Sequence, residues 1–471
     1  MAKYVLALDV GTTTLRAHIY DKDAQIIGTG VCKVEIMRPK PGYCEMDPDL
    51  LWRQVQQVIT DCIKDAYTDS SNICAMGITV QRNTFITWDK ETAEPFHNFI
   101  TWQDLRASDY VKQWNKSYTL WLRKRVEENQ VYFGCIETWL LWKLTKGKVY
   151  ATEYSCASTT GLFDPFQLGW SGVVSHVSKV PLNILPPIKD TSGQFGICDP
   201  DIFGAAIPIT AIIADQQSAT FGQCCFNVGD VKCTMGTGTF IDCNTGHKSH
   251  ASIAGFYPLV GWKYENETVY LAEGNSSDTG QCLEWAKSIG LYEKVEDTSD
   301  VVMSVQDSGG VYFVPAFSGL QAPINDDKAC TSLVGISPHT SKVHILRAIL
   351  ESLAFRFKLL YDAVHRETKI NLSDVIRCDG GVCNNEFLVQ LVSDLTGRTM
   401  DRPVHMDMTS LGVAFLAGLA VGVWKDKSEL LSIRKTEKQF EPRDSPQYKE
   451  ILTEWKNAMR RSMGWYNDVD I

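Results

Sequence analysis

A short turn near the start of the chain has the residues needed to bind a phosphate group. It follows an apolar run that ends near Asp9, and it consists of Gly11, Thr12, Thr13 and Thr14. Glycine lets the backbone approach an anion closely, and hydroxyl and backbone N–H groups can donate hydrogen bonds to phosphate oxygens. A carboxylate such as Asp9 can hold a hydrated Mg2+ ion beside the phosphate. A plain β-turn accounts for the same residues, so this segment alone leaves both interpretations open.

A second turn of the same kind lies between two strand-like runs that begin at residue 231. It consists of Gly236, Thr237, Gly238 and Thr239. Two such turns that face each other across a cleft can hold both ends of a polyphosphate, which a single turn cannot do. The repetition therefore points to a ligand with more than one phosphate.

Two further strand ends carry residues that suit a nucleotide and a reacting hydroxyl. Asp379, Gly380 and Gly381 lead from an apolar run into a helical pattern that begins near Asn385. Backbone approach at a helix start suits an anionic or flat group, although packing alone explains many such junctions. Asp215 ends another apolar run. A buried carboxylate is costly, so we expect a general base there, with a helix N-cap as the alternative.

Composition and absent signatures exclude several classes of protein. The sequence has no GxxxxGK(S/T), no GxGxxG after the first strand, and no HExxH or GxSxG, and its nine histidines lack metal-ligand spacing. The 46 basic and 56 acidic residues give a net charge of -10, which argues against nucleic acid as the main partner. The apolar stretch at residues 411–424 is too short to span a bilayer. We expect a cytoplasmic protein with no transmembrane segment and with its 15 cysteines reduced.

The elements that must position these residues follow from apolar spacing. Residues 4–9 and 15–21 predict a β-hairpin, and Asp47 followed by Pro48 predicts a helix start. Further strands are expected in the first half at residues 76–80 and 209–214. The second half repeats this character, with strands at 311–315 and 375–379 and helices at 345–365 and 385–395. A chain of 471 residues is too long for one ordinary core. We therefore predict two α/β lobes, residues 1–223 and 224–471, around a cleft.

In this order, the motifs resemble those of the FGGY carbohydrate kinases, most closely the glycerol kinase branch. The resemblance covers nearly the whole chain, and it rests on the two turns together with Gln81-Arg82, Trp102 to Arg106, Asp215-Gln216-Gln217 and Asp379-Gly380-Gly381. It implies a two-lobed actin-like ATPase fold, of the ribonuclease-H-like type, with a nucleotide cleft between the lobes. It also implies the cofactors ATP and Mg2+.

The family resemblance assigns roles to individual positions. The first lobe would contact the ATP phosphates through Thr12, Thr13, Thr14 and Arg16, with Asp9 near the metal ion. The second lobe would hold the rest of the nucleotide through Gly236, Thr237, Gly280, Gly381 and Asn385. The polyol site would consist of Arg82, Asn83, Trp102, Asp215, Gln216 and Phe240, with Asp215 as the general base.

The implied reaction is ATP-dependent phosphorylation of glycerol to glycerol 3-phosphate by direct phosphoryl transfer. Three departures from the family keep alternatives open: Asn83 replaces a glutamate, Gln321 replaces a glycine, and the chain is shorter between Trp114 and Gly134. Asn83 and the shorter stretch favour a kinase for another polyol or ketose, and the shorter stretch also favours a catalytically weak ATP-binding protein. Gln321 could change the affinity for the nucleotide. Family members are often dimers or tetramers, so a homo-oligomer is also open.

Overall fold

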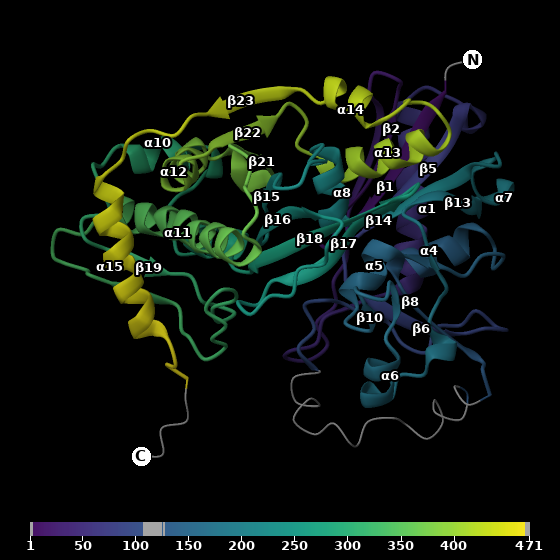
Figure 1. Cartoon of the computed structure of the whole chain (residues 1–471), viewed down its shortest axis with the longest axis horizontal. Coiled ribbons are helices and arrows are strands. Elements are labelled where there is room, and N and C mark those ends of the chain that lie inside the picture. Colours follow the sequence, from purple (N-terminus) through teal and green to yellow (C-terminus); the bar gives the residue numbers. More distant parts are fainter. Residues whose placement is uncertain (1–2, 107–124, 126–127, 467–471) are drawn as a thin grey trace. The chain divides into compact units, whose positions relative to one another are not determined.

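Two compact units make up the structure, a computed structural model that describes residues 3–106, 125 and 128–466 (Figure 1). Unit 1 comprises Met1–Cys224, Leu259–Val269 and Met408–Ile433, and unit 2 comprises Cys225–Pro258, Tyr270–Asp407 and Arg434–Ile471. The first crossing between units, after Cys224, lies next to the boundary predicted after residue 223. Two later segments also belong to unit 1, whereas the predicted single boundary assigns them to the second lobe.

A mixed six-stranded sheet forms the centre of unit 1. Its order is β13-β14-β5-β1-β2-β3, with bounds β1 (Tyr4–Val10), β2 (Thr14–Tyr20), β3 (Ile26–Lys33), β5 (Ile73–Val80), β13 (Ser192–Ile197) and β14 (Pro208–Ala214). β1 pairs with β2 in antiparallel register, which confirms the predicted hairpin. β5 runs parallel to both β1 and β14, which places it between them.

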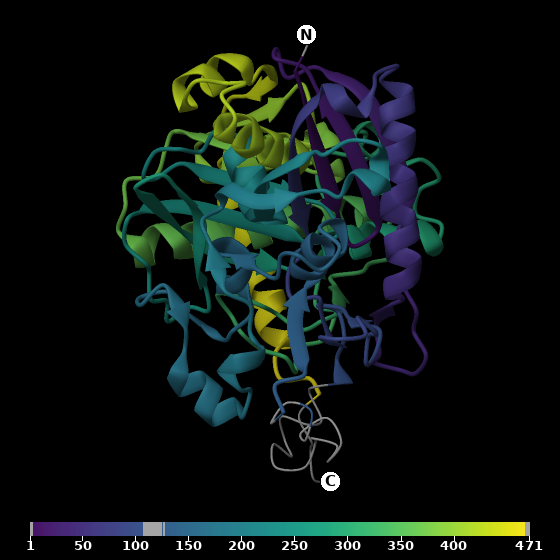
Figure 2. The same ribbon diagram turned by 90° about the vertical axis from the view of Figure 1, so that its right-hand side faces the viewer.

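Helices cover both faces of this sheet. Leu6, Leu8 and Ile78 belong to the core cluster that includes α1 (Pro48–Asp65), whereas Gly77 approaches Val413 of α13 (Met408–Ala420). Successive side chains of a strand point to opposite faces, so the two helices cover opposite sides. Figure 2 shows α1, in blue-violet, running along the first strands of the chain. The prediction of central strands covered on both sides is confirmed.

Close contact between α13 and α8 (Asp215–Gly222) depends on glycine. A Cβ atom at Gly412 would lie 1.8 Å from the Ser218 carbonyl oxygen, and one at Gly222 would lie 2.3 Å from the Met408 oxygen. Both glycines therefore allow the two helix backbones to touch. The apolar stretch from residue 411 is a buried helix, as predicted.

Smaller elements complete unit 1. The predicted helix start is confirmed, because Asp47 caps α1 and Pro48 is its first residue. The remaining strands are β4 (Glu45–Met46), β6 (Phe85–Asp89), β7 (Phe99–Ile100), β8 (Val131–Cys135), β9 (Thr152–Glu153), β10 (Phe163–Asp164), β11 (Gly169–Trp170) and β12 (Ile188–Lys189). The remaining α-helices are α4 (Ile136–Leu144), α5 (Tyr154–Thr159), α6 (Gly172–Ser178), α7 (Pro200–Phe203) and α14 (Lys427–Ile433).

A second mixed sheet runs in the order β17-β18-β16-β15-β21-β22-β23. Its strands are β15 (Val231–Met235), β16 (Thr239–Gly246), β17 (Tyr257–Tyr264), β18 (Glu267–Ser276), β21 (Val375–Asp379), β22 (Thr399–Pro403) and β23 (Thr436–Phe440). β15 and β16 form the second predicted hairpin. A two-stranded sheet adds β19 (Tyr312–Val314) and β20 (Ser332–Val334).

The helices of unit 2 are α9 (Thr279–Ser288), α10 (Thr298–Met303), α11 (Lys342–Thr368), α12 (Glu386–Thr396) and α15 (Gln447–Ser462). α11 and α12 confirm the two helices predicted in the second half. α15 lies against β19 and buries Trp455 in the core. All 15 cysteines are free. Within residues 3–106, 125 and 128–466, none of the helices combines the length and apolar character needed to cross a bilayer.

Candidate active site

Three parallel strands of unit 1 end side by side. Val10 of β1 is in register with Val80 of β5, and Val80 is in register with Ala214 of β14. Beyond these ends, the Gln81 backbone N–H donates to the Val10 carbonyl oxygen at 2.8 Å. Ligands of open α/β sheets bind at the carboxyl ends of the strands. The turn after β1, the Gln81-Arg82 pair after β5 and Asp215 after β14 therefore lie along one edge of the sheet.

The first turn carries a carboxylate and a guanidinium at its base. The Gly11 N–H donates to the Thr14 carbonyl oxygen at 3.0 Å, which closes the turn between β1 and β2. Asp9 and Arg16 are register partners, and Arg16 Nη1 lies 3.8 Å from Asp9 Oδ2. Asp9 is buried, whereas the Arg16 side chain is 33% exposed. The turn therefore presents backbone and hydroxyl donors beside one buried acid.

Trp102, one of the predicted polyol residues, is hydrogen-bonded to the first turn. Its indole N–H donates to Thr12 Oγ1 at 3.0 Å, and its backbone N–H donates to Thr84 Oγ1 at 3.3 Å. The indole is 39% exposed. A partly exposed aromatic ring with its polar edge engaged leaves an apolar face for the carbon side of a ligand.

Arg82 and Asp215 form an ion pair across the ends of β5 and β14. Arg82 Nε lies 3.4 Å from Asp215 Oδ1, and the two side chains are 12% and 23% exposed. Asp215 is the first residue of α8, and the N-cap position is Ala214. The N-cap alternative for Asp215 does not hold, because the N-cap of α8 is Ala214 and no side chain caps this helix start. The Asp215 Oδ1 accepts from the neighbouring Gln216 N–H at 2.7 Å.

Asn83 and Gln216 complete the predicted polyol residues of unit 1. Asn83 has a φ of 55° and an exposed side chain. Asparagine adopts this left-handed conformation more readily than most residues, which suits the substitution at this position. Gln216 is buried beside Asp215.

A charged cluster that the sequence analysis did not assign supports the segment containing Trp102. Arg106 Nη2 lies 2.6 Å from Asp104 Oδ2 and 2.6 Å from Glu45 Oε1, and its guanidinium stacks on Tyr43 at 4.0 Å. Hydrogen bonding with Asp104 is the main cause that raises the pKa of Arg106. The Asp104 and Arg106 spacing was a visible signal. Glu45 lies 61 residues away in the chain, so only the fold brings it into this cluster.

The second turn, in unit 2, is built from backbone contacts. The Gly236 N–H donates to the Gly238 carbonyl oxygen at 2.9 Å, and the Gly280 N–H donates to the Thr237 oxygen at 2.9 Å. A Cβ atom at Gly280 would lie 2.8 Å from the Gly236 oxygen, so only glycine fits without a shift. A Cβ atom at Gly236 or Gly381 would meet no atom within 4 Å, which leaves their backbones open to a ligand.

Asp379 and Asn385 lie on either side of the glycine pair in unit 2. Thr234 Oγ1 donates to Asp379 Oδ1 at 2.5 Å. The Asn385 side chain caps α12, because its Oδ1 accepts from the Leu388 N–H at 2.8 Å, and its Nδ2 donates to Thr298 Oγ1 at 2.9 Å. Asn385 therefore has a structural role whether or not it contacts a nucleotide.

Gln321, which stands where the family has a glycine, stabilises its own loop through side-chain hydrogen bonds. Its Oε1 accepts from the Ser277 N–H at 3.1 Å, and its Nε2 donates to the Ser318 carbonyl oxygen at 2.9 Å. Unit 2 therefore accommodates the longer side chain by hydrogen-bonding both of its polar atoms.

The predicted site residues fall on both units. Those of unit 1 are Asp9, Thr12, Thr13, Thr14, Arg16, Arg82, Asn83, Trp102, Asp215 and Gln216. Those of unit 2 are Gly236, Thr237, Phe240, Gly280, Gly381 and Asn385. The shortened stretch begins at Trp114, which is outside the described residues.

The donor set at the first turn suits Mg2+. No group of three or more histidine, cysteine, aspartate or glutamate side chains that could hold a metal ion occurs among the described residues. Mg2+ keeps several waters and usually takes only one or two carboxylates together with substrate phosphates. The buried Asp9, at the base of a turn rich in phosphate donors, matches that requirement.

Comparison with known proteins places both halves of the chain in one family. Residues 4–120 and 119–222 match the N-terminal domain of the FGGY family of carbohydrate kinases, and residues 231–421 match its C-terminal domain. Glycerol kinase 5 of Danio rerio is 47% identical over 515 residues, covering 98% of this chain and 97% of the relative. Glycerol kinase 5 of Homo sapiens is 48% identical over 509 residues, covering 98% and 96%.

A solved structure gives the same result at the level of the fold. The glycerol kinase of Plasmodium falciparum with ADP has a TM-score of 0.90 and 30% identity, covering 98% of each chain. This likeness confirms the predicted two-domain α/β kinase fold. The 515 aligned positions of the Danio rerio relative exceed the 471 residues of this chain, so the relative has residues that are missing here. The N-terminal family model also matches in two pieces that meet at residues 119–120.

Proposed function

Because the chain belongs to the FGGY family of carbohydrate kinases, we propose that it transfers the γ-phosphate of ATP to glycerol and forms glycerol 3-phosphate. The family and the glycerol kinase relatives make it a phosphotransferase with an alcohol acceptor. The ADP-bound relative supports ATP as the donor. Glycerol, the general base and the metal ion are the parts of this proposal that need testing.

The observation that carries the proposal is the row of groups along one edge of the unit 1 sheet. The Arg82–Asp215 pair, at 3.4 Å, follows β5 and β14, and the Trp102–Thr12 hydrogen bond, at 3.0 Å, ends on the turn after β1. A partly exposed carboxylate therefore shares one sheet edge with a turn suited to phosphate. Phosphoryl transfer to an alcohol requires both groups near the same oxygen.

In the proposed reaction, Asp215 accepts the proton of a primary hydroxyl as that oxygen attacks the γ-phosphorus. The bond between the γ-phosphorus and the bridging oxygen breaks, and ADP leaves with the electron pair. Arg82 orients the Asp215 carboxylate, and Trp102 offers an apolar face to the carbon chain of glycerol. Positioning and charge stabilisation supply most of the rate in such transfers.

The first turn binds the donor phosphates in this scheme. Thr12, Thr13 and the N–H groups of this turn donate to phosphate oxygens, and Asp9 would hold Mg2+ there. When bound, Mg2+ neutralises negative charge on the phosphates. In unit 2, the open backbones at Gly236 and Gly381 leave room for a nucleotide to approach.

The test is ADP release by the purified chain with MgATP, with and without glycerol, for wild type and Asp215→Asn. We expect nucleotide affinity within about 3-fold of wild type and a glycerol-dependent turnover lowered by about 100- to 10,000-fold. Asp61→Asn, on the exposed side of α1, is the matched control and should keep full turnover. An Asp215→Asn variant with more than a tenth of wild-type turnover would overturn the assignment of the base.

A second candidate is a kinase for another polyol or ketose. Asn83 favours it, and so does the shortened segment of the first half, where the family match splits at residues 119–120. A panel of polyols and ketoses decides between the two: glycerol inert and a sugar phosphorylated would select the second. Nucleotide binding without transfer to any member would instead indicate a catalytically weak ATP-binding protein.

A further inference from the structure

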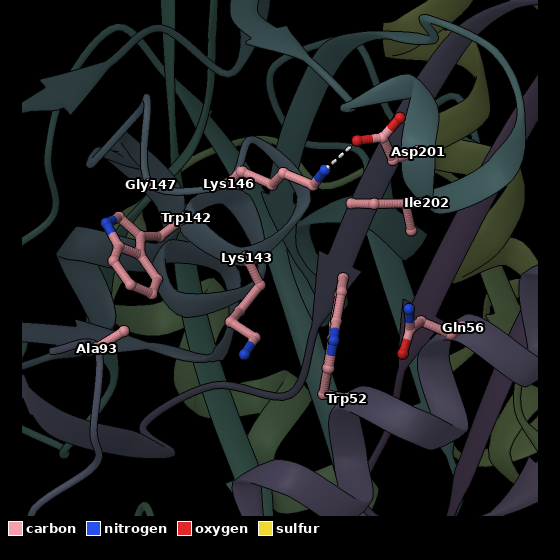
Figure 3. Close-up of a pocket in the computed structure, with 9 residues that line it drawn as sticks. All are labelled: Trp52, Gln56, Ala93, Trp142, Lys143, Lys146, Gly147, Asp201 and Ile202. Atoms are coloured by element: carbon pink, nitrogen blue, oxygen red, sulfur yellow. Dashed lines mark hydrogen bonds and ion pairs between the residues drawn. The ribbon is translucent and has the colours of Figure 1, made fainter.

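Unit 1 has a cavity whose lining shares no residue with the candidate active site. Its volume is about 450 Å3, within the range of small-molecule sites, and it is bordered by α1, the end of α4 and α7. Figure 3 shows the side chains that matter here: Trp52, Gln56, Trp142, Lys143, Lys146 and Asp201.

Lys143 is an ammonium group that the Asp49 carboxylate attracts only from beyond ion-pair distance. Within the part of the chain that the structure describes, no hydrogen bond or ion pair involves its Nζ, which lies 5.5 Å from the ring centroids of both Trp52 and Trp139. Burial lowers the pKa of Lys143, so its charge is partly removed from water. The two indole faces compensate this only in part, because cation–π contacts of this kind are weaker than a charge-assisted hydrogen bond.

Lys146, the other lysine of the cavity, differs because its charge is already balanced. Its Nζ lies 2.5 Å from Asp201 Oδ2 and 3.0 Å from Asp199 Oδ1. Among the described residues, the cavity therefore offers one positive charge that forms no hydrogen bond or ion pair, on Lys143. A ligand with two negative charges would meet the Asp201 carboxylate without a second free cation, so a single negative charge matches better.

The walls of the cavity suit a flat apolar group. Figure 3 shows the Lys143 side chain pointing into the space between Trp52 and Trp142. Ile202 adds an aliphatic surface, and the Gln56 amide borders the same space. Trp52 packs edge-on against Trp139, at 6.4 Å and 90°, which fixes the orientation of its ring. The face of such a fixed ring can stack on a planar ligand.

We propose that this cavity binds a small organic monoanion that carries its carboxylate on a planar apolar body. The carboxylate accepts hydrogen bonds from Lys143 Nζ, and the planar body packs against the indole of Trp52, with Trp142 bordering the same space. This inference does not depend on the proposed kinase reaction, because none of these residues belongs to that site.

The probe is 1-naphthoate, titrated into the full chain by calorimetry and by quenching of tryptophan fluorescence. The test variant is Lys143→Met, which keeps an unbranched stem, and the matched control is Lys146→Met on the same segment. We expect saturable binding at one site, weakened about 10-fold or more by Lys143→Met and by less than about 3-fold in the control. Absence of saturable binding to wild type would overturn the proposal.

Two analogues separate the charge from the ring. Neutral 1-naphthamide should bind about 10-fold more weakly than 1-naphthoate, and 1-naphthyl phosphate should bind no better than the carboxylate. Equal binding of the amide and the carboxylate, or equal binding to Lys143→Met, would show a purely apolar site and would overturn the proposal. If Lys143→Met lowers the unfolding temperature, Trp52→Phe replaces it as the test variant, with the same 10-fold expectation.

Discussion

The two turns that resemble each other in sequence differ in where they keep their acid. In unit 1, Asp9 of β1 is the register partner of Thr79 on β5. In unit 2, Thr234 of β15 is the register partner of Asp379 on β21. Acid and threonine are thus exchanged between neighbouring strands. Thr234 donates to Asp379 at 2.5 Å, whereas the buried Thr79 hydroxyl has no hydrogen-bond partner among the described residues.

The charges around the turns also differ in depth. Asp9 and Arg16 are directly below the first turn, and the Arg16 side chain is 33% exposed. The corresponding hairpin of unit 2 has Lys232 and Asp242, which pair at 2.9 Å and are fully buried. The first turn thus presents charge where a substrate can meet it. The second uses its ion pair as part of the core and presents mainly backbone groups.

The difference teaches that one sequence device can serve two purposes. A Gly-Thr turn fixes only the local backbone, and its neighbours decide whether it contributes charge or shape. We therefore expect substitutions at the first turn to affect catalysis, and those at the second to affect stability and nucleotide binding.

The largest effect on stability is expected from Lys232→Met. Removing one partner leaves the Asp242 carboxylate buried without compensation, at a cost of about 3–5 kcal/mol. Arg16→Met should cost less, about 1 kcal/mol, because the Arg16 side chain is 33% exposed and water can reach its buried partner Asp9. Denaturant unfolding of both variants measures the contrast, and equal losses would contradict it. The double variant Lys232→Met with Asp242→Leu should recover most of the loss.

A pH dependence comes next and concerns a buried acid of unit 1. Burial raises the pKa of Glu137 to about 7, although the Thr138 and Thr152 hydroxyls and a backbone N–H donate to its carboxylate. The folded chain holds this proton more tightly than the unfolded chain, whose glutamate titrates near 4.5. Stability should therefore fall as pH rises from about 4.5 to about 7, by up to about 3 kcal/mol.

Glu137→Gln tests this expectation because the amide mimics the protonated acid. Relative to wild type, the variant should gain stability at pH 8 compared with pH 5 in thermal unfolding. The exposed Glu94→Gln is the control and should show no such difference. A wild-type to variant gap that stays constant with pH would refute the assignment.

A third prediction distinguishes a glycine that stabilises the second turn from a glycine that contacts the nucleotide. Gly280→Ala places a Cβ atom 2.8 Å from the Gly236 oxygen and should cost about 1–3 kcal/mol of stability. Gly236→Ala meets no protein atom within 4 Å, so stability should stay within about 0.5 kcal/mol while ADP binding weakens. Calorimetry with ADP and thermal unfolding measure both. Unchanged ADP affinity in Gly236→Ala would remove this glycine from the nucleotide site.

The smallest effect is expected from Trp102→Phe. The ring is retained, but the hydrogen bond to Thr12 is lost, which is worth about 0.5–1.5 kcal/mol. We expect kcat/KM for the acceptor to fall about 2- to 10-fold, with ATP affinity unchanged. A loss of kcat/KM above 100-fold would mean that the indole N–H of Trp102 does more than donate a hydrogen bond to Thr12.

The sequence by itself determined the local elements and the residue types at their ends. The hairpins, the Asp47 cap and the helices of the second half follow from spacing and from hydrogen bonds between near neighbours. These elements can be predicted from sequence because the contacts that form each of them lie within its own segment. The order of motifs was enough to identify the family.

Only the tertiary structure decided which distant residues meet. It paired Arg82 with Asp215, linked Trp102 to Thr12 across 90 residues, and brought Met408–Ile433 into unit 1. It also placed Lys143 Nζ 5.5 Å from the ring centroids of both Trp52 and Trp139. Apolar periodicity predicts that one face of an element is buried, but it does not show which other element packs against that face. The packing of the complete sheet with its helices decides this.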